Sequence, residues 1–174
     1  ENIDHYLAKE GYAALYKTLN EMTPDQVIEV VTQSGLRGRG GGGFSAGVKW
    51  GLARKTQRWL KYVICNADEG DPGAFMDRSV LEGDPHSVIE GMIIAGYAIG
   101  ANTGYNYIRG EFIDEPVPRF EAAVKEAYEA GLLGKNIKGS GIDFDLNTFV
   151  GAGAYICGEE TALLESLEGK QGKP

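Results

Sequence analysis

The feature that most constrains the fold is an alternation of short apolar runs with longer amphipathic runs. The short runs predict strands at Tyr62–Cys65, Tyr105–Arg109 and Phe144–Val150. The longer runs between them predict helices at Pro85–Ile99 and at Pro118–Ala130. Strands that alternate with helices of this length indicate a parallel sheet with right-handed crossovers and helices on its faces.

The segment before this alternation is predicted to be helical. One helix is expected over residues 4–20, and a second begins at Thr23-Pro24-Asp25-Gln26, which has the pattern of a capping box with proline at the first helical position. Further helices are expected over 46–56 and from Gly158 to about Leu167. We therefore expect an α/β protein, a three-layer Rossmann-like parallel sheet with helices on both faces, preceded by an N-terminal helical segment. The expected division is a helical segment over 1–34 and a ligand-binding domain over 35–174.

Composition excludes several classes of function. The 174 residues carry a formal net charge of −8, which disfavours binding to nucleic acid or to an anionic membrane. No apolar run approaches the roughly 20 residues that span a bilayer. Cys65 and Cys157 lack further ligands at metal-binding spacing, so they predict no metal site and a reduced, cytoplasmic chain. Because the chain begins at Glu1 rather than methionine and stops at Pro174, we expect it to be a piece of a longer protein.

A run of glycines favours binding of an anion. Gly38, Gly40 and Gly43 match G-x-G-x-x-G, but a helix rather than a strand precedes them, so an ordinary dinucleotide-binding turn is not predicted. Successive main-chain amides without side chains, with Arg39 and Lys49 nearby, suit a phosphate or pyrophosphate. The alternative is a flexible loop with solvated arginines.

Polar residues follow the first predicted strand. Asn66, Asp68, Glu69 and Asp71 lie within six residues of each other. Side chains at the carboxyl end of a strand converge on the ligand crevice of a parallel sheet, where they suit a polyol or the polar edge of a heterocycle. A surface turn is one alternative. A Mg²⁺ or Ca²⁺ site is another, but the spacing does not match an EF-hand loop.

A second segment, residues 151–160, follows the third strand and should meet the first at the same edge of the sheet. Its glutamates Glu159 and Glu160 open a helix, where acidic residues also serve simply to complement the helix dipole. Phe44, beside the glycine run, is either a core residue or a platform for stacking an aromatic ring. No nucleophile motif such as G-x-S-x-G occurs, which disfavours hydrolase chemistry.

Several blocks together resemble the flavin-binding subunit of respiratory complex I, the 51-kDa or F-type subunit of NADH dehydrogenase. The same module occurs in NAD(P)-reducing hydrogenases and NAD-linked formate dehydrogenases. The resemblance covers about residues 10–174, and its blocks are Ser34–Phe44, Gly47–Trp50, Cys65–Glu69 and Gly151–Leu163.

The resemblance implies an FMN site and an NADH site. The residues that it places against FMN are Gly38, Arg39, Gly40, Gly41, Lys49, Asn66, Asp68, Glu69, Gly158, Glu159 and Glu160. Those that it places near NADH are Phe44, Asp71 and Glu160. Asp71 stands where the family usually has glutamate, which shortens the reach toward NADH, and Gly42 stands where the family often has alanine.

The implied chemistry belongs to the cofactors. A hydride passes from the nicotinamide of NAD(H) or its phosphorylated form to FMN, and single electrons then pass to an iron–sulfur chain, so no side chain need act as acid or base. The implied partners are a thioredoxin-like [2Fe–2S] subunit and a larger iron–sulfur subunit, which would hold the protein in the cytoplasm or at the cytoplasmic face of a membrane. The [4Fe–4S] centre belongs to the full-length protein only, and we expect this chain alone to bind FMN weakly and to be inactive. The alternative is a docking domain of the same fold that has lost the flavin.

Overall fold

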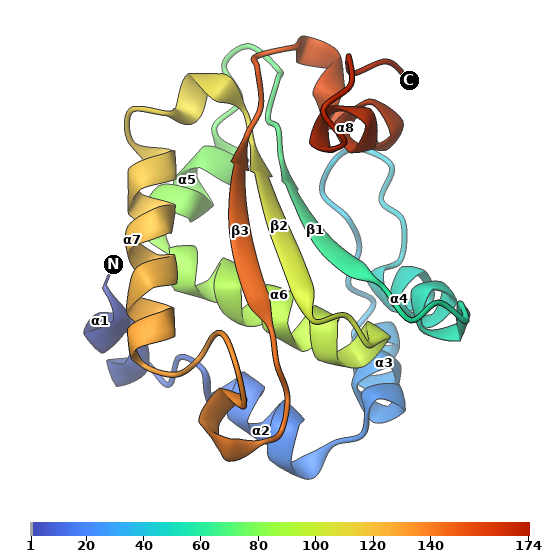
Figure 1. Ribbon diagram of the computed structural model, residues 1–174, viewed down its shortest axis with the longest axis vertical. Coiled ribbons are helices and arrows are strands. Elements are labelled where there is room, and N and C mark those ends of the chain that lie inside the picture. Colours follow the sequence, from blue (N-terminus) through green and yellow to red (C-terminus); the bar gives the residue numbers. More distant parts are fainter. Residues whose placement is uncertain (1) are drawn as a thin grey trace.

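Three parallel strands form the sheet, and the computed structural model describes it together with the rest of residues 2–174 (Figure 1). The strands are β1 (Tyr62–Ala67), β2 (Thr103–Ile108) and β3 (Asp145–Val150), hydrogen-bonded in that order. The predicted parallel sheet is confirmed. Because all three strands run the same way, their carboxyl ends lie at one edge of the sheet, where the polar segments begin.

The two crossover helices pack on one face of the sheet. They are α6 (Pro85–Ile99), which contacts β1 and β2, and α7 (Pro116–Glu129), which contacts β3. Right-handed crossovers that move step by step in one direction across a sheet place their helices on the same side. The main core forms there and contains Ile89, Ile93, Phe120, Ile108 and Leu146.

The other face is covered only near the carboxyl ends of the strands. There a short 3₁₀ turn, η3 (Tyr155–Gly158), and α8 (Glu160–Leu167) pack on the sheet through a small cluster of Tyr107, Cys157 and Leu163. Farther down the same face the covering stops, and Tyr62 is 47% exposed. Helices therefore lie on both faces, as predicted, but the two layers are unequal.

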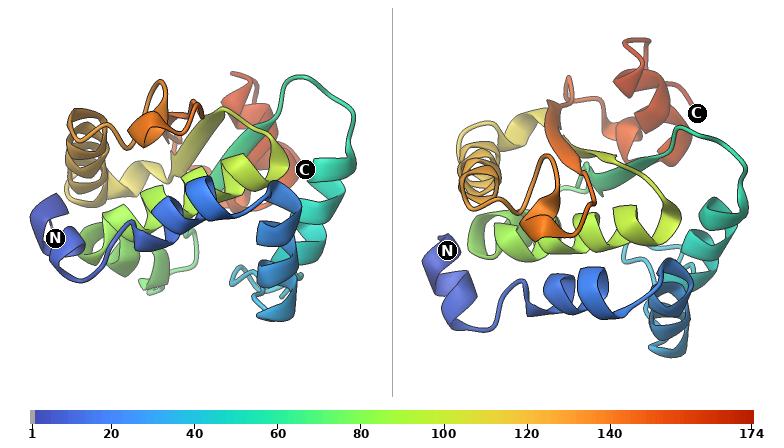
Figure 2. Two further views of the ribbon diagram at one scale, coloured as in Figure 1. Left: turned by 90° about the horizontal axis from the view of Figure 1, so that it is seen from below. Right: turned by 60° about the horizontal axis from the view of Figure 1, so that its bottom comes forward.

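The N-terminal helices form a further layer beneath α6, on its side away from the sheet (Figure 2). The single helix predicted over 4–20 is wrong. The chain forms α1 (Ile3–Ala8) and α2 (Ala13–Glu21), and the backbone between them turns at Glu10 and Tyr12, whose φ angles are +64° and +63°. The packing of α2 on α6 supplies the reason for the break, because the Glu90 carboxylate of α6 accepts hydrogen bonds from the amides of Tyr12 at 3.0 Å and Leu15 at 2.8 Å.

The remaining helices surround the ends of the sheet. The predicted capping box is confirmed at the start of α3 (Pro24–Gln33), and α3 packs against α4 (Ala46–Lys55). A helix that was not predicted, α5 (Met76–Gly83), follows the polar segment after β1. Two more 3₁₀ turns, η1 (Gly110–Phe112) and η2 (Ile137–Gly139), flank α7. None of the helices described for residues 2–174 has the length and apolar character needed to span a membrane.

Candidate functional site

The predicted site segments meet around one cavity of about 700 Å³. The glycine loop and α4 form one wall, the residues after β1 form another, and η3 with the start of α8 forms the third. The predicted residues that line the cavity are Gly38, Arg39, Gly40, Lys49, Asn66, Asp68, Glu69, Asp71, Gly158 and Glu159. The expectation that segments distant in sequence meet at the carboxyl edge of the sheet is confirmed.

The glycine loop is an open hairpin. Its base is closed by hydrogen bonds from the Gly38 amide to the Phe44 carbonyl and from the Ala46 amide to the Leu36 carbonyl, both at 2.9 Å. Gly41 turns the chain with a φ of +106°, which a residue with a side chain rarely adopts. A Cβ atom added at any residue of 40–43 would meet no heavy atom within 4 Å. The protein therefore does not fill the space above these amides, and a ligand can approach them closely.

Two cations face this open loop. Arg39 donates a hydrogen bond to the Arg37 carbonyl at 2.9 Å, which keeps its guanidinium near the loop backbone. Lys49 lies on α4, which begins directly after the loop, and within residues 2–174 its ammonium has no ion-pair or hydrogen-bond partner. The loop amides and these cations together form a cationic wall in an acidic protein, which suits a phosphate group.

Asn66 ties two walls of the cavity together. Its side-chain oxygen accepts a hydrogen bond from the Asp68 amide at 3.2 Å, and its side-chain nitrogen donates to the Gly158 carbonyl at 2.9 Å. A Cβ atom at Gly158 would lie 3.0 Å from the Asp68 carbonyl oxygen. A side chain at position 158 would therefore require the backbone of η3 or of the segment after β1 to shift.

Asp68 has an acceptor position without a partner. The residue is only 8% exposed, and within residues 2–174 its buried Oδ2 atom has no hydrogen-bond donor. Burial raises the pKa of the Asp68 carboxyl, Arg109 opposes the rise, and Glu111 adds to it. Arg109 itself is held by Glu111 at 2.7 Å and by the Glu69 carbonyl. An unpartnered carboxylate oxygen in the wall of a polar cavity can accept a hydrogen bond from a ligand hydroxyl.

Two predicted site glutamates also have structural roles. Glu69 accepts hydrogen bonds from the amides of Asp77 at 2.8 Å and Arg78 at 3.4 Å, and so caps α5. Glu159 caps α8 by accepting from the amides of Ala162 at 3.0 Å and Thr161 at 3.1 Å, and these bonds lower the pKa of its carboxyl. Both residues line the cavity while their carboxylates are engaged with helix N-termini.

Three of the predicted residues lie outside the lining of the cavity. They are Gly41, Phe44 and Glu160. Phe44 is 57% exposed, so the core interpretation of this residue is wrong. Stacking of a ligand ring on Phe44 stays a prediction.

Residues that sequence reasoning missed line the cavity from η3 and α5. Tyr155 belongs to a block that was already singled out, but the alternation pattern does not indicate which way its ring points. Met76 and Asp77 were missed because α5 was not predicted. Burial and the nearby Glu69 raise the pKa of the Asp77 carboxyl. No cluster of three or more His, Cys, Asp or Glu side chains arranged to hold a metal ion occurs in the described part of the chain.

The pattern of a protein family described as the Nuo51 FMN-binding domain matches residues 31–174. The chain belongs to this family. Among curated proteins, this Nuo51-type chain is 58% identical over 174 residues to the NADP-reducing hydrogenase subunit HndC of Solidesulfovibrio fructosivorans, and the match covers 100% of the chain and 35% of the relative. It is 49% identical over 173 residues to the F-type subunit of the NADH-quinone oxidoreductase of Escherichia coli K12, with 99% and 39% covered.

A solved structure shares the fold of this Nuo51-type chain. An NAD⁺-reducing [NiFe]-hydrogenase in the air-oxidised state matches with a TM-score of 0.81 at 39% sequence identity, over 100% of this chain and 29% of the hydrogenase chain. The chain thus spans between a third and two-fifths of the length of the curated relatives named above.

Proposed function

We propose that this chain is the FMN-binding part of an NAD(P)H-oxidising oxidoreductase subunit and that the cavity at the carboxyl edge of the sheet holds the flavin. The observation that carries the proposal is that three walls converge on one cavity. The glycine-loop wall has open main-chain amides and the cations Arg39 and Lys49, and the wall after β1 has the buried Asp68 Oδ2 atom, which has no donor within residues 2–174. The residues fit the group, since FMN has a phosphate, a chain of hydroxyls and a flat ring. Membership in the Nuo51 family supports the same cofactor.

Each wall is assigned one part of the cofactor. The amides of residues 38–41, with Arg39 and Lys49, would hold the phosphate as a preformed anion site. Asp68 would accept a hydrogen bond from a hydroxyl of the sugar-alcohol chain through its free oxygen. Asn66 is positioned in the wall by its hydrogen bonds to Gly158 and Asp68, and its remaining amide hydrogen and lone pair would contact FMN.

FMN bound there would accept a hydride from NAD(P)H and release its electrons singly to iron–sulfur centres of a larger complex. The chain binds and orients the two rings and supplies no acid or base. Asp71 and Asp77 place negative charge on one side of the cavity, which opposes further negative charge on the reduced cofactor. Phe44, Asp71 and Glu160 are proposed to contact NADH from the surface around the cavity.

The proposed setting follows that of the relatives, which are named as subunits of NADH-quinone oxidoreductase and of a hydrogenase. A thioredoxin-like [2Fe–2S] subunit and a larger iron–sulfur subunit are the proposed partners. The [4Fe–4S] centre is proposed for the full-length protein alone. The partners would hold the chain in the cytoplasm or at the cytoplasmic face of the membrane.

FMN titration of the flavin-free complete protein tests the proposal. We expect flavin fluorescence to be quenched stoichiometrically and the flavin absorbance to bleach when NADH or NADPH is added. Lys49→Met should weaken FMN binding about tenfold or more, because it removes a charge-assisted contact. The matched control is Lys55→Met on the same helix, since Lys55 lies outside the cavity and should leave affinity unchanged. Absence of flavin binding would favour the docking-domain alternative.

A further inference from the structure

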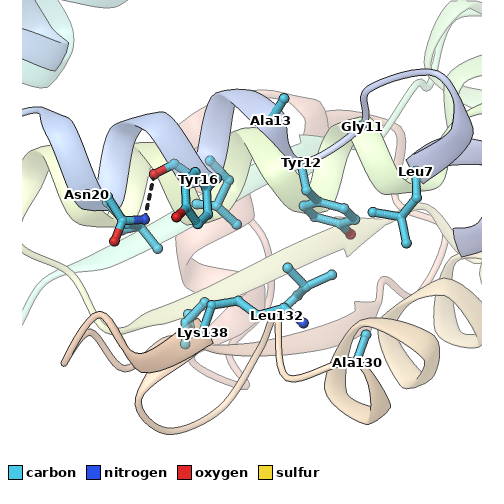
Figure 3. Close-up of a pocket in the computed structure, with 12 residues that line it drawn as sticks. Leu7, Gly11, Tyr12, Ala13, Tyr16, Asn20, Ala130, Leu132 and Lys138 are labelled. Atoms are coloured by element: carbon cyan, nitrogen blue, oxygen red, sulfur yellow. Dashed lines mark hydrogen bonds between the residues drawn. The ribbon is translucent and has the colours of Figure 1, made fainter.

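A second cavity lies between α2 and the segment that links α7 to β3. It encloses about 390 Å³. In Figure 3, Leu7, Tyr12, Tyr16 and Asn20 lie on one side of this cavity and Ala130, Leu132 and Lys138 on the other. It shares no lining residue with the cavity assigned to the flavin, so it is a separate site.

The lining is largely apolar. Its aliphatic lining residues include Leu7, which is 48% exposed, and the buried Leu15, Leu132 and Ile137, and the buried ring of Tyr12 lies beside them. The Tyr12 hydroxyl is directed into the core, where it lies 2.9 Å from His86 Nδ1 and is not available to a ligand. A cavity of this size with an apolar body and few polar groups is typical of sites for small organic ligands.

One lining residue of the cavity carries an uncompensated charge. Lys138 is an exposed lining residue, and in the described part of the chain its ammonium has no ion-pair or hydrogen-bond partner. Asn20 lines the cavity as well, and its amide nitrogen is occupied by the Tyr16 carbonyl at 2.8 Å. In a protein with a net charge of −8, a free ammonium beside an apolar cavity favours an anionic group next to it.

Backbone strain is concentrated around the same cavity. Across residues 2–174, the non-glycine residues with positive φ are Glu10, Tyr12, Asn136 and Lys138. Tyr12 and Lys138 line the cavity, and the other two lie within two residues of them. Such conformations are costly and occur preferentially at ligand clamps and other functional sites. Both loops that bound the cavity therefore contain left-handed backbone, which in the first loop is held by the hydrogen bonds that Glu90 accepts from the Tyr12 and Leu15 amides.

We propose that this cavity binds a medium-chain aliphatic monocarboxylate, with the chain between α2 and residues 130–137 and the carboxylate beside Lys138. The apolar lining recognises the chain, and the unpaired ammonium recognises the head group. The limited volume admits one slender chain and excludes a two-chain lipid. This site stands independently of the flavin cavity, so failure of one proposal leaves the other in place.

Calorimetric titration of the complete protein with decanoate tests the proposal. We expect saturable binding of one decanoate, and each methylene removed, through nonanoate to octanoate, should weaken it about fourfold. Decylamine has the same chain with a positive head group, and it should not bind measurably at about 1 mM.

Two variants with matched controls locate the site. Lys138→Met keeps the aliphatic stem and should weaken decanoate binding about fivefold, whereas Lys125→Met on α7 should have no effect. Ala130→Leu fills the cavity and should abolish binding, whereas Ala122→Leu on the exposed surface of α7 should not. The far-UV circular dichroism spectrum should remain unchanged in all four variants, which shows that the fold is intact.

Three outcomes would overturn the proposal. They are absence of decanoate binding at about 1 mM, equal binding of decylamine, and binding that persists in Ala130→Leu. If Ala130→Leu instead changes the oligomeric state while decanoate fails to bind the unaltered protein, the cavity belongs to an interface between proteins.

Discussion

Gly40 and Gly42 form a natural matched pair at the scale of single residues. A Cβ atom at either position would meet no protein atom within 4 Å, and neither residue has a positive φ. They differ in position, because Gly40 lines the proposed flavin cavity and Gly42 does not. Any difference between their alanine variants therefore reports on the ligand and not on the folded chain.

We expect Gly40→Ala to weaken FMN binding at least about tenfold, because its methyl group occupies space that the cofactor needs. Gly42→Ala should leave affinity unchanged. Both variants should unfold at the same or slightly higher denaturant concentration, because alanine lowers the conformational entropy of the unfolded chain and can thereby add about 0.4–1 kcal/mol to the free energy of unfolding. Fluorescence titration and urea denaturation measure the two effects, and equal affinities in the two variants would contradict the assignment of the loop.

The Asp68 carboxylate should lower the stability of the flavin-free protein and favour the binding of FMN. We expect Asp68→Asn to raise the free energy of unfolding of the flavin-free protein by about 1 kcal/mol at neutral pH, because it removes a buried charge with an unpaired oxygen. The same change should weaken FMN binding, since the amide is a poorer acceptor than the carboxylate. Urea denaturation of this variant measures the change in the free energy of unfolding, and fluorescence titration measures the change in FMN affinity.

The pH dependence of this effect follows from the raised pKa of Asp68. Its folded-state pKa lies above the usual 3.8, so the destabilisation is complete above the raised value, fades as the pH falls from that value toward 3.8, and is lost below 3.8. Asp143 is the contrasting case, because the Asn136 amide and Lys135 lower its pKa. Asp143→Asn should therefore lower stability at neutral pH, and that loss should fade as the pH falls through the depressed folded-state pKa. A gain in both variants at neutral pH would contradict this account.

At the scale of elements, local signals located the strands and the start of α3, and distant contacts decided the rest. Thr23 and Gln26 cap each other within four residues, so this helix start can be read directly from the sequence. The start of α2 is capped by Glu90, which is 75 residues away from Leu15, and the start of α5 is capped by Glu69 across a turn. Apolar spacing alone therefore predicted one long helix where there are two, and missed α5.

Glu90 should accordingly contribute more to stability than a local cap does. It is 7% exposed and accepts hydrogen bonds from the Tyr6 hydroxyl at 2.6 Å and from the amides of Tyr12 and Leu15. We expect Glu90→Leu to lower the free energy of unfolding by about 3 kcal/mol, because it leaves buried donors unpaired. Thr23→Ala should cost about 1 kcal/mol. Urea denaturation compares them, and a smaller loss for Glu90→Leu than for Thr23→Ala would contradict the role of this contact.

At the scale of the whole molecule, the topology predicted the site better than any single motif did. Parallel strands bring residues 66–71 and 151–160 to one edge, and the structure places both there with the glycine loop. The individual contacts could not be predicted in the same way. The carboxylates of Glu69 and Glu159 accept hydrogen bonds from amides at the starts of α5 and α8. The exposure of Phe44 depends on how the loop folds back on itself.

A ligand that touches all three walls should stabilise the molecule as a unit. At a hundredfold excess over its dissociation constant, FMN should add about 2.7 kcal/mol to the free energy of unfolding. Riboflavin lacks the phosphate, so it should add less at the same concentration, because the glycine loop and Lys49 then have no anion to hold. Thermal unfolding of the complete protein with each compound measures the difference, and equal stabilisation would place the phosphate elsewhere.

The hydrogen bond from Asn66 to the Gly158 carbonyl fixes two walls of the cavity relative to each other. It joins the end of β1 to η3 and so sets the width of the space that a ligand must fit. Another wall is the glycine hairpin, which is closed by main-chain hydrogen bonds at its base and by a hydrogen bond from the Arg37 guanidinium to the Gly43 carbonyl, while residues 40–43 face open space. The width of the cavity and the binding of an anion thus depend on different segments of the chain.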